Sequence, residues 1–517
     1  EATMTKAIAT VHLACYKILN VSDAGSMSKD VVDEFTSKPK WKKIEVLVLS
    51  FFKSVLHTIA SLADNHSAQQ KQVLIFLVSS LEHYIPLLGP MHRLTSTTLK
   101  VLVGIWCIHD IDSDNGSEES VKTQKNGSDV RGHGVLRSRP IAMLLPGTAA
   151  EEAFRTTYLG YTRHCKSYND QTAPSISFMI ACLVELFKCD IVLSYQLAFL
   201  YVRQLGLYLR TAVTKKTAES VKQLVSWQYV NCLRLWSHVV AAYPRQDDGG
   251  LGELSFPLIQ IMLGVISVAS SSINTPCKLH LIEFIQIIAA HCRCFVPVAP
   301  KLLDILETPD LSGKPVPSTE IPNKLSAMLR LAADAINKVP VRDIIKSLRV
   351  EVEIYRFNPG FPEYIYITAR KLRTFLKTCK VAKWRDLLKA VLNLIDDVVA
   401  DCKKYRIMAQ KSPLASGNEF EPLLKFAVND SRSKQVLPVE HRVRKLLGNG
   451  ASTATASIPP VADKECEPVG GKRQSDVNTS TRKKKRTKKT KNLVATSGND
   501  GDEDVVEALQ DWSDDDA

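Results

Sequence analysis

Several features that mark common classes of protein are missing from this sequence of 517 residues. Its longest nearly apolar run, Phe256 to Ala269, is shorter than the roughly 20 residues that a helix needs to cross a bilayer, and Gln260 interrupts it. The run therefore predicts a buried helix, and we expect no membrane span and no membrane partner. No secretory signal stands at the start, where Glu1 replaces Met and suggests that a natural N-terminal segment is missing.

Cysteines are present, but they follow no pattern. The twelve cysteines occur one at a time, mostly inside apolar runs and without regular spacing. This distribution is typical of a reduced intracellular protein whose thiols pack as small core residues.

Motifs that bind phosphates or carry a nucleophile are missing as well. The nearest approach to a GxxxxGK[ST] loop, VGGKRQ at Val469, lacks the first glycine and the hydroxyl. Neither a GxGxxG after a strand nor a GxSxG turn occurs. We expect the acidic side chains on solvated helix faces or in loops. The sequence thus predicts no enzyme, no catalytic residues and no cofactor.

One group of residues has the composition of a metal site, namely Cys277, His280, His291, Cys292 and Cys294. The intervening stretch LIEFIQIIAA has the composition of a helix, which would separate the two histidines by about 16 Å at about 1.5 Å per residue. Zinc ligands lie within about 2.3 Å of one metal. We therefore expect core or helix-end residues here and no metal.

Apolar residues at helical spacing dominate the rest of the chain. Three stripes show it: Ile176, Met179, Ile180, Leu183 and Phe187 behind Pro174; Leu325, Met328, Leu329, Ala332 and Ile336; and Trp384, Leu387, Leu388, Val391, Leu392, Ile395, Val398 and Val399. Only LRVEVEI, residues 348–354, alternates with a period of two, and it fits either a strand or a helix.

Successive amphipathic helices joined by short loops predict an all-α fold of stacked pairs, a solenoid like those of HEAT or armadillo repeats. An irregular all-α domain is the alternative, because no strict sequence period is visible. The expected parts are an N-terminal helical region (1–108), a disordered insertion (109–140) whose polar segment is 109–134, a helical-repeat core (141–448) and a disordered charged tail (449–517).

The net charge of +13 belongs to the body of the chain. Residues 472–491 hold ten lysines and arginines against Asp476, and residues 492–517 hold nine acids, clustered from 500 to 517, and no base, so these segments cancel. A positive stripe that contacts RNA phosphates is one hypothesis for the body, with the bases Arg203, Arg210, Lys215, Lys216, Lys222 and Arg234. Base-specific readout is not supported, because no RNA-recognition motif or zinc finger is present.

The basic run in the tail has the density of a nuclear import signal. The bases are Lys472, Arg473, Arg482, Lys483, Lys484, Lys485, Arg486, Lys488, Lys489 and Lys491. A solvated charge run without a receptor is the alternative. Ser513, which precedes Asp514, is a candidate site for an acid-directed kinase.

Several blocks, in order, resemble the nucleolar complex protein 2 family. They are TTYLGYTRHCKSYNDQTAPSISFMIACLVELFKCDIVLSYQLAFLYVRQLGLYLRTAVTKK, SWQYVNCLRLWSHVV, LSFPLIQIMLGVISVASSSINTPCKLHLIEFIQIIAAHCRCFVPVAPKLLDIL and FLKTCKVAKWRDLLKAVLNLIDD, within Leu145 to Tyr405. The resemblance implies a helical-repeat factor, not an enzyme, that assembles large-subunit ribosomal precursors in the nucleolus and moves with them into the nucleoplasm. It implies nucleolar complex proteins 1 and 3 and the pre-60S particle as partners.

Two hypotheses follow from these features. The first is a nuclear scaffold that binds a sister helical protein, contacts pre-rRNA through its basic surface and enters the nucleus on an import receptor. The second is a helical-repeat nuclear adaptor or transcriptional co-regulator without RNA contact.

Overall fold

A computed structural model of the chain describes residues 2–19, 36–63, 68–88, 91–107, 148–244, 250–307, 328–331, 341–358 and 360–410. The chain divides into two units, Glu1–Thr455 and Ala456–Ala517, and every described residue lies in the first. Within the described ranges all regular structure is helical and no strand occurs, which confirms an all-α protein. The predicted insertion, 109–140, and tail, 449–517, lie outside these ranges.

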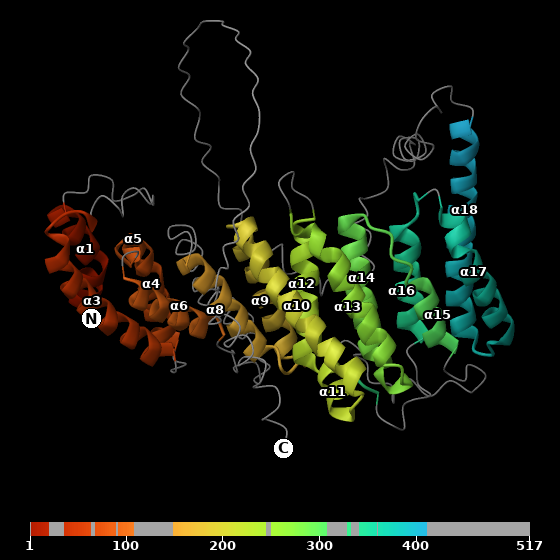
Figure 1. Ribbon diagram of the computed structural model, residues 1–517, viewed down its shortest axis with the longest axis horizontal. Helices are drawn as coiled ribbons and strands as arrows, with labels where there is room; N and C mark the ends of the chain where they lie inside the picture. Colours follow the sequence, from red (N-terminus) through yellow and green to blue (C-terminus); the bar gives the residue numbers. More distant parts are fainter. Residues whose placement is uncertain are drawn as a thin grey trace, which may run out of the picture. The chain divides into compact units, whose positions relative to one another are not determined.

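The described helices fall into two groups, before and after residues 108–147, which lie outside the described ranges (Figure 1). The first group contains α1 (Ala2–Leu19), α3 (Trp41–Ala63), α4 (Ala68–Ser80), η1 (Leu81–Tyr84), α5 (Ile85–Leu88) and α6 (His92–Trp106). The second group contains α8 (Thr148–His164), α9 (Thr172–Phe187), α10 (Ile191–Lys215), α11 (Ala218–Leu224), α12 (Trp227–Ala242), η3 (Leu251–Leu254), α13 (Ser255–Val268), η4 (Ser272–Asn274), α14 (Thr275–Cys292), α15 (Ala299–Glu307), α16 (Val341–Ile354), α17 (Phe361–Thr378) and α18 (Ala382–Gln410).

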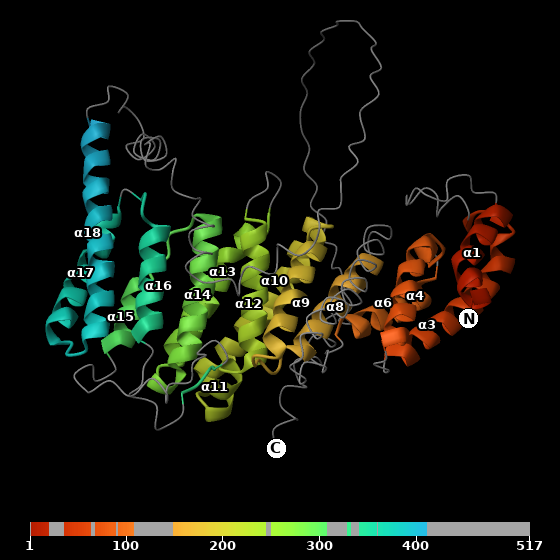
Figure 2. The ribbon, with the colours of Figure 1, turned by 180° about the vertical axis from the view of Figure 1, so that it is seen from behind.

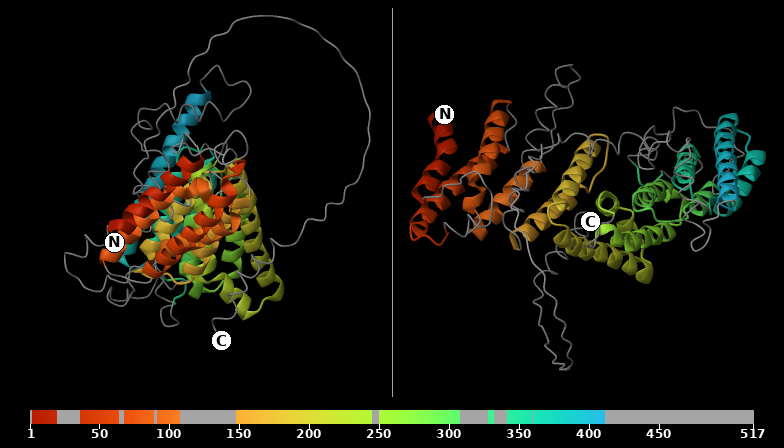
Figure 3. Two further views of the ribbon diagram at one scale, coloured as in Figure 1. Left: turned by 90° about the vertical axis from the view of Figure 1, so that its left-hand side faces the viewer. Right: turned by 90° about the horizontal axis from the view of Figure 1, so that it is seen from above.

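The helices of the second group, from α8 onward, pack in an alternating order. One series of contacts runs from α9 to α12, α14, α16 and α18, and a second set joins α10 to α13 and α15 to α17 (Figures 1 and 2). Sequential pairs connect the two sets, since α13 contacts α14, α15 contacts α16 and α17 contacts α18 (Figure 3). Most inner helices are therefore covered on more than one side.

Side chains of α12 complete the hydrogen bonding at the C-terminal end of α8. The last carbonyls of a helix have no partner within it. The amide of Gln228 donates to the Thr162 carbonyl over 3.0 Å, and that of Asn231 donates to the Cys165 carbonyl over 3.0 Å. In return, the Tyr161 hydroxyl donates to the Asn231 carbonyl over 2.9 Å. These buried bonds fix α8 against α12.

The apolar stripes predicted for two helices are confirmed. Ile176, Met179, Ile180, Leu183 and Phe187 are all buried in α9, which also begins two residues before Pro174. In α18 the stripe is buried from residue 388 to 398, and the polar residues opposite it are exposed. Segment 348–354 is helical, in α16, which decides between the two interpretations of its pattern.

One helical prediction is wrong in its described part. Residues 328–331, within the third predicted stripe, are not helical. Instead, the Leu329 carbonyl accepts a hydrogen bond from the Cys277 N–H over 3.2 Å, and the Leu331 N–H donates to the Ile273 carbonyl over 2.8 Å. Leu329 and Leu331 are buried. Contact with the start of α14 therefore decides the conformation of this segment. The helical spacing of its apolar residues did not reveal that contact.

Two described stretches are long and apolar enough to cross a membrane by length and composition alone, Trp41–Leu62 and Leu251–Val268. Core helices of globular proteins meet the same criterion. The second stretch contains most of the run that we expected to be a buried helix. Its helix, α13, contacts α10, α12 and α14, and Leu258, Met262 and Val265 are fully buried.

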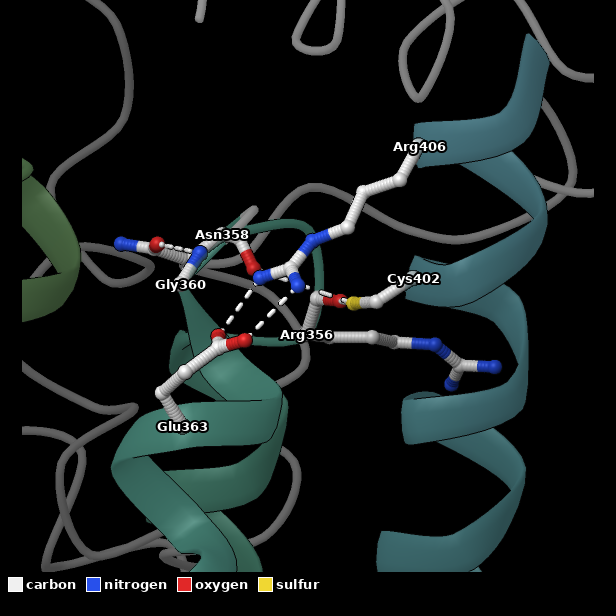
Figure 4. Close-up of polar contacts among 6 residues, drawn as sticks. All are labelled: Arg356, Asn358, Gly360, Glu363, Cys402 and Arg406. Carbon is white, nitrogen blue, oxygen red and sulfur yellow. Dashed lines mark hydrogen bonds and ion pairs between the residues drawn. The ribbon is translucent and has the colours of Figure 1, made fainter. Parts of the chain in front are cut away.

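Polar contacts join the start of α17 to α18 (Figure 4). Both terminal nitrogens of the Arg406 guanidinium donate to the Glu363 carboxylate, over 2.7 and 2.5 Å. The Cys402 thiol donates to the carbonyls of Arg356 and Asn358 over 3.6 and 3.7 Å. These contacts hold the connection between α16 and α17 against α18.

Candidate interaction surface

Among the described helices from α8 onward, α10 exposes the most large apolar side chains, and its two ends are well defined. At its start, the Asp190 side chain accepts a hydrogen bond from the Leu193 N–H over 3.0 Å, as an N-cap residue does. At its end, Lys216 has a left-handed backbone with φ of 51°, and its N–H donates to the Ala212 carbonyl over 3.0 Å. Thr217 then caps α11, which limits the connection between the two helices to two residues.

Helix α10 packs closely against α13 with the same chain direction. A Cβ atom on Gly206 would lie 3.5 Å from Ile261, and one on Gly264 would lie 2.5 Å from Leu209. Nearer the two N-termini, the Tyr195 hydroxyl donates to the Glu253 carboxylate over 3.4 Å. All three contacts advance together along both helices, so α10 and α13 run parallel.

Four large apolar side chains are exposed on the outward side of α10, among polar ones such as Gln196 and Thr214. Val192, Phe199 and Val213 occupy three of four positions spaced by seven residues and are 67%, 52% and 49% exposed. Leu207, which lies one residue after the third of these positions, is 41% exposed. Gly206 occupies the remaining seven-residue position and faces Ile261, so this face runs along the edge where α10 meets α13. A seven-residue repeat of apolar side chains is the pattern by which one helix packs against another.

The N-terminal half of α13 adds to this apolar face. Phe256 is 70% exposed. The pairing of Tyr195 with Glu253 and of Gly206 with Ile261 places Phe256 level with Phe199. The two phenyl groups therefore widen the apolar face where the two helices begin.

The charges beside this face are all positive on α10. The helix from Ile191 to Lys215 contains no Asp or Glu. Arg203 and Arg210 are exposed and lie seven residues apart, and Lys215 and Lys216 are exposed at the helix end. Within the part of the chain that the structure describes, Arg203 and Arg210 form no ion pair. The result is an apolar face with a basic border.

Five of the six bases predicted to form a positive stripe are exposed, and the sixth, Arg234, is not. Arg203, Arg210, Lys215, Lys216 and Lys222 are exposed on α10 and α11. Arg234 is instead half-buried on α12. Its guanidinium donates to the Tyr168 hydroxyl over 3.2 Å and to the Ser177 hydroxyl over 3.3 Å, and lies 5.6 Å from the Tyr168 ring centre. Arg234 thus joins α12 to α9, and its inclusion in an outer stripe was wrong.

The residues with the composition of a metal site lie on α14 and just after it. Both His280 and His291 belong to this one continuous helix. Cys277 is fully buried, and burial raises the pKa of its thiol to about 12. The His291 ring nitrogen Nδ1 lies 2.8 Å from the Ile287 carbonyl, and the Cys292 thiol lies 3.9 Å from the Val240 carbonyl. Across the described ranges, no group of three or more His, Cys, Asp or Glu could hold a metal ion.

The described cysteines match the prediction from their scatter along the chain. Eleven are free thiols, and eight of these are buried. Hydrogen bonds from several of them end on nearby carbonyls, as from Cys165 to Gln228 over 3.9 Å. They serve as small core residues.

The ten bases of the predicted import signal, from Lys472 to Lys491, lie outside the described residues, and so does Ser513.

The sequence did not predict that the acidic side chain of Glu351 is buried. Glu351 is 1% exposed on α16, where we expected a solvated side chain. Its carboxylate accepts hydrogen bonds from the Tyr364 hydroxyl over 2.6 Å, the Gln286 amide over 3.2 Å and the Val298 N–H over 3.3 Å. Burial raises the pKa of Glu351 to about 7, although these hydrogen bonds lower it.

The role of Glu351 follows from its partners. Both carboxylate oxygens bind groups of the protein itself, from α14, from α17 and from the segment before α15. The carboxylate therefore connects three elements around α16. The sequence signal was ambiguous, because Glu351 shares the polar side of the alternating pattern in LRVEVEI with Arg349 and Glu353.

Comparison with known proteins gives a match over most of the helical region. Residues 148–425 match the model of the Noc2p family, a range that contains α8 to α18. The chain is 25% identical to the nucleolar complex-associated protein 2 of Arabidopsis thaliana over 434 residues, which are 83% of this chain and 52% of that protein. It is 26% identical to the nucleolar complex protein 2 of Drosophila melanogaster over 363 residues, 69% of this chain and 44% of that protein.

A third relative is the nucleolar complex protein 2 homolog of Caenorhabditis elegans, with 20% identity over 356 residues, 66% of this chain and 46% of that protein. The chain thus spans about half the length of the relatives it matches.

Proposed function

Because the chain belongs to the Noc2p family, we propose that it is a non-enzymatic nucleolar scaffold for the assembly and intranuclear transport of large ribosomal subunit precursors. The observation that carries this proposal is the family match across all the helices from α8 to α18, together with relatives named nucleolar complex protein 2. The expected locations are the nucleolus and the nucleoplasm.

The architecture proposed for the scaffold is a HEAT-like or armadillo-like solenoid. In such a fold each helical pair packs on its neighbours, so the equivalent helices of successive pairs contact each other in parallel rows. The contact series from α9 to α18 and the parallel packing of α10 on α13 support this architecture. A solenoid presents long helix faces to partners, as the apolar face of α10 illustrates.

The proposed partners are nucleolar complex proteins 1 and 3, the pre-60S particle and an import receptor, with pre-rRNA as a further contact. An RNA contact would use charge more than base identity. Lys215, Lys216 and Lys222, at the end of α10 and on α11, are exposed and supply positive charge for it. Such a contact would weaken steeply as salt rises, since each neutralised phosphate releases counterions.

Sucrose-gradient sedimentation of extracts from growing cells tests the scaffold. We expect the protein in the fractions that contain large-subunit precursors, and migration only as a free protein would contradict the proposal. Nuclease treatment of the same extracts separates the scaffold from the adaptor: an unchanged set of bound proteins and an unchanged nucleolar position after RNA digestion would favour an adaptor without RNA contact.

Nuclear entry is proposed to depend on the basic run around Arg482 to Arg486. Deleting residues 481–491 should lower the nuclear fraction of a fluorescent fusion of the chain. Deleting residues 500–517, the acidic end, is the control and should leave that fraction unchanged. Equal nuclear accumulation of the intact chain and the first deletion would refute the signal. Phosphorylation is proposed at Ser513, and mass spectrometry of the purified protein tests it.

A further inference from the structure

We propose that the α10 seam, defined as Val192, Phe199 and Val213 with the adjacent Arg203 and Arg210, binds an acidic amphipathic helix of a partner protein. This inference deepens the proposed scaffold function and rests on it for its biological context. The partner helix would present apolar residues at heptad spacing to the α10 seam and Asp or Glu to the two arginines.

The dimensions of the α10 seam define the length of this helix. Val192 and Val213 are 21 residues apart, which corresponds to about 32 Å at about 1.5 Å per residue. A partner helix of about three heptads would cover that distance. The exposed Phe256 of α13, level with Phe199, would contact the same helix from the side.

The pattern of side chains favours a helix over other occupants. Val192, Phe199 and Val213 fall on positions spaced by seven residues, the interval that matches the period of a facing helix. In helix pairs of this kind, charges beside the apolar positions select the partner. Arg203 and Arg210 lie four residues after Phe199 and Gly206, beside the apolar positions, and no acid on α10 neutralises them. They therefore select a helix with carboxylates in the flanking positions.

The same charges argue against two other occupants. A second copy of this chain that used the same face would bring Arg203 and Arg210 of both copies together, and like charges would repel. RNA would satisfy the arginines, but its phosphates would leave the exposed Val192, Phe199 and Val213 without an apolar partner.

The first experiment measures binding of a designed peptide to the full chain by fluorescence anisotropy. The peptide has 21 residues, leucine at the two apolar heptad positions and glutamate at the flanking positions. Phe199→Asp should weaken binding at least tenfold, because a charge then lies in the middle of the α10 seam. Ile367→Asp is the matched control, since Ile367 is also exposed, on α17, and should leave binding within twofold.

The second experiment reverses the charges. The double variant R203E/R210E should lose affinity for the glutamate peptide and gain affinity for the same peptide with lysine in the flanking positions. The variant K377E/K380E changes the charge by the same amount at exposed positions on α17 and after it, and should not show this exchange of preference. Equal response of both double variants would mean that only net charge matters and would overturn the assigned site.

Two further outcomes would assign the α10 seam to a different partner. A single-stranded RNA oligonucleotide that binds and depends on Arg203 and Arg210, while the glutamate peptide does not bind, would replace the helix partner with RNA. Self-association in sedimentation velocity that Phe199→Asp abolishes would replace it with a second copy. Peptide binding by the purified chain is independent of pre-ribosomal sedimentation in cells. Failure of the α10 seam and failure of the scaffold function are therefore distinguishable.

Discussion

Replacing Glu351 with glutamine should remove a pH dependence from the stability of the protein. In the native state the Glu351 carboxyl is buried among α14, α16 and α17, and its pKa rises from an ordinary value of 4.5 to about 7. Burial is the largest cause, because it disfavours the charged form. Glutamine has a similar shape and does not titrate.

The sign and the size follow from linkage. Between pH 4.5 and about 7 the native carboxyl holds its proton while the unfolded one has lost it, so the native state binds more protons. The free energy of unfolding therefore falls as pH rises through this window and is lower by about 3 kcal/mol above it, at about 1.4 kcal/mol per pKa unit. The stabilising contribution is complete only below the unfolded pKa.

Urea unfolding of the full chain at pH 5 and pH 8, followed by tryptophan fluorescence, measures the effect. The wild type should lose more stability between these pH values than Glu351→Gln does. Burial also raises the pKa of Glu283 and Asp343, but both groups are present in both proteins and cancel in the difference. Asp386→Asn, at an exposed position of α18, is the control and should retain the wild-type slope. Equal slopes for wild type and Glu351→Gln would refute this account of the buried carboxyl.

Three further predictions, two of them with a control substitution, test the packing by the same unfolding measurement. Gly252→Ala should destabilise by about 2 kcal/mol, because the new Cβ would overlap the backbone carbonyl of residue 244, whereas Gly104→Ala, with nothing within 4 Å of its Cβ, should stabilise by about 0.5 to 1 kcal/mol. Equal effects of the two would contradict the contact. Arg234→Ala should cost about 1 to 3 kcal/mol through its lost hydrogen bonds, and Arg203→Ala should stay within about 0.5 kcal/mol. Comparable losses of unfolding free energy in the two variants would contradict the different environments of Arg234 and Arg203. Arg406→Ala should cost less than about 1 kcal/mol at low salt, because its ion pair is exposed, and a loss that persists in 1 M salt would argue against screening.

Much of the local structure was determined by the sequence. The stripe from Ile176 to Phe187 predicts α9 because residues three and four apart lie on one side of a helix, and all five of its members are buried. The same reasoning holds for α18. The family resemblance, carried by ordered blocks between Leu145 and Tyr405, is confirmed by the family match over residues 148–425.

The candidate surface was only half visible in the sequence. The bases of α10 were identified as a group, but the exposed Phe199 and Val213 were not, because an apolar residue in a helix is equally consistent with the core. Their exposure depends on where α13 and α12 pack, and the sequence of α10 does not contain that information.

Tertiary structure alone decided which polar residues lie inside and where one apolar segment leaves the helical pattern. Periodicity tells which side chains share a face of a helix, but not how many faces its neighbours cover. Glu351 is buried because α14 and α17 supply donors for it, and Arg234 points inward because the hydroxyls of Tyr168 and Ser177 accept hydrogen bonds from its guanidinium. Leu329 meets α14 through its backbone carbonyl, an acceptor common to every residue type. These contacts join residues distant in the chain, so their energies depend on packing that no local pattern records.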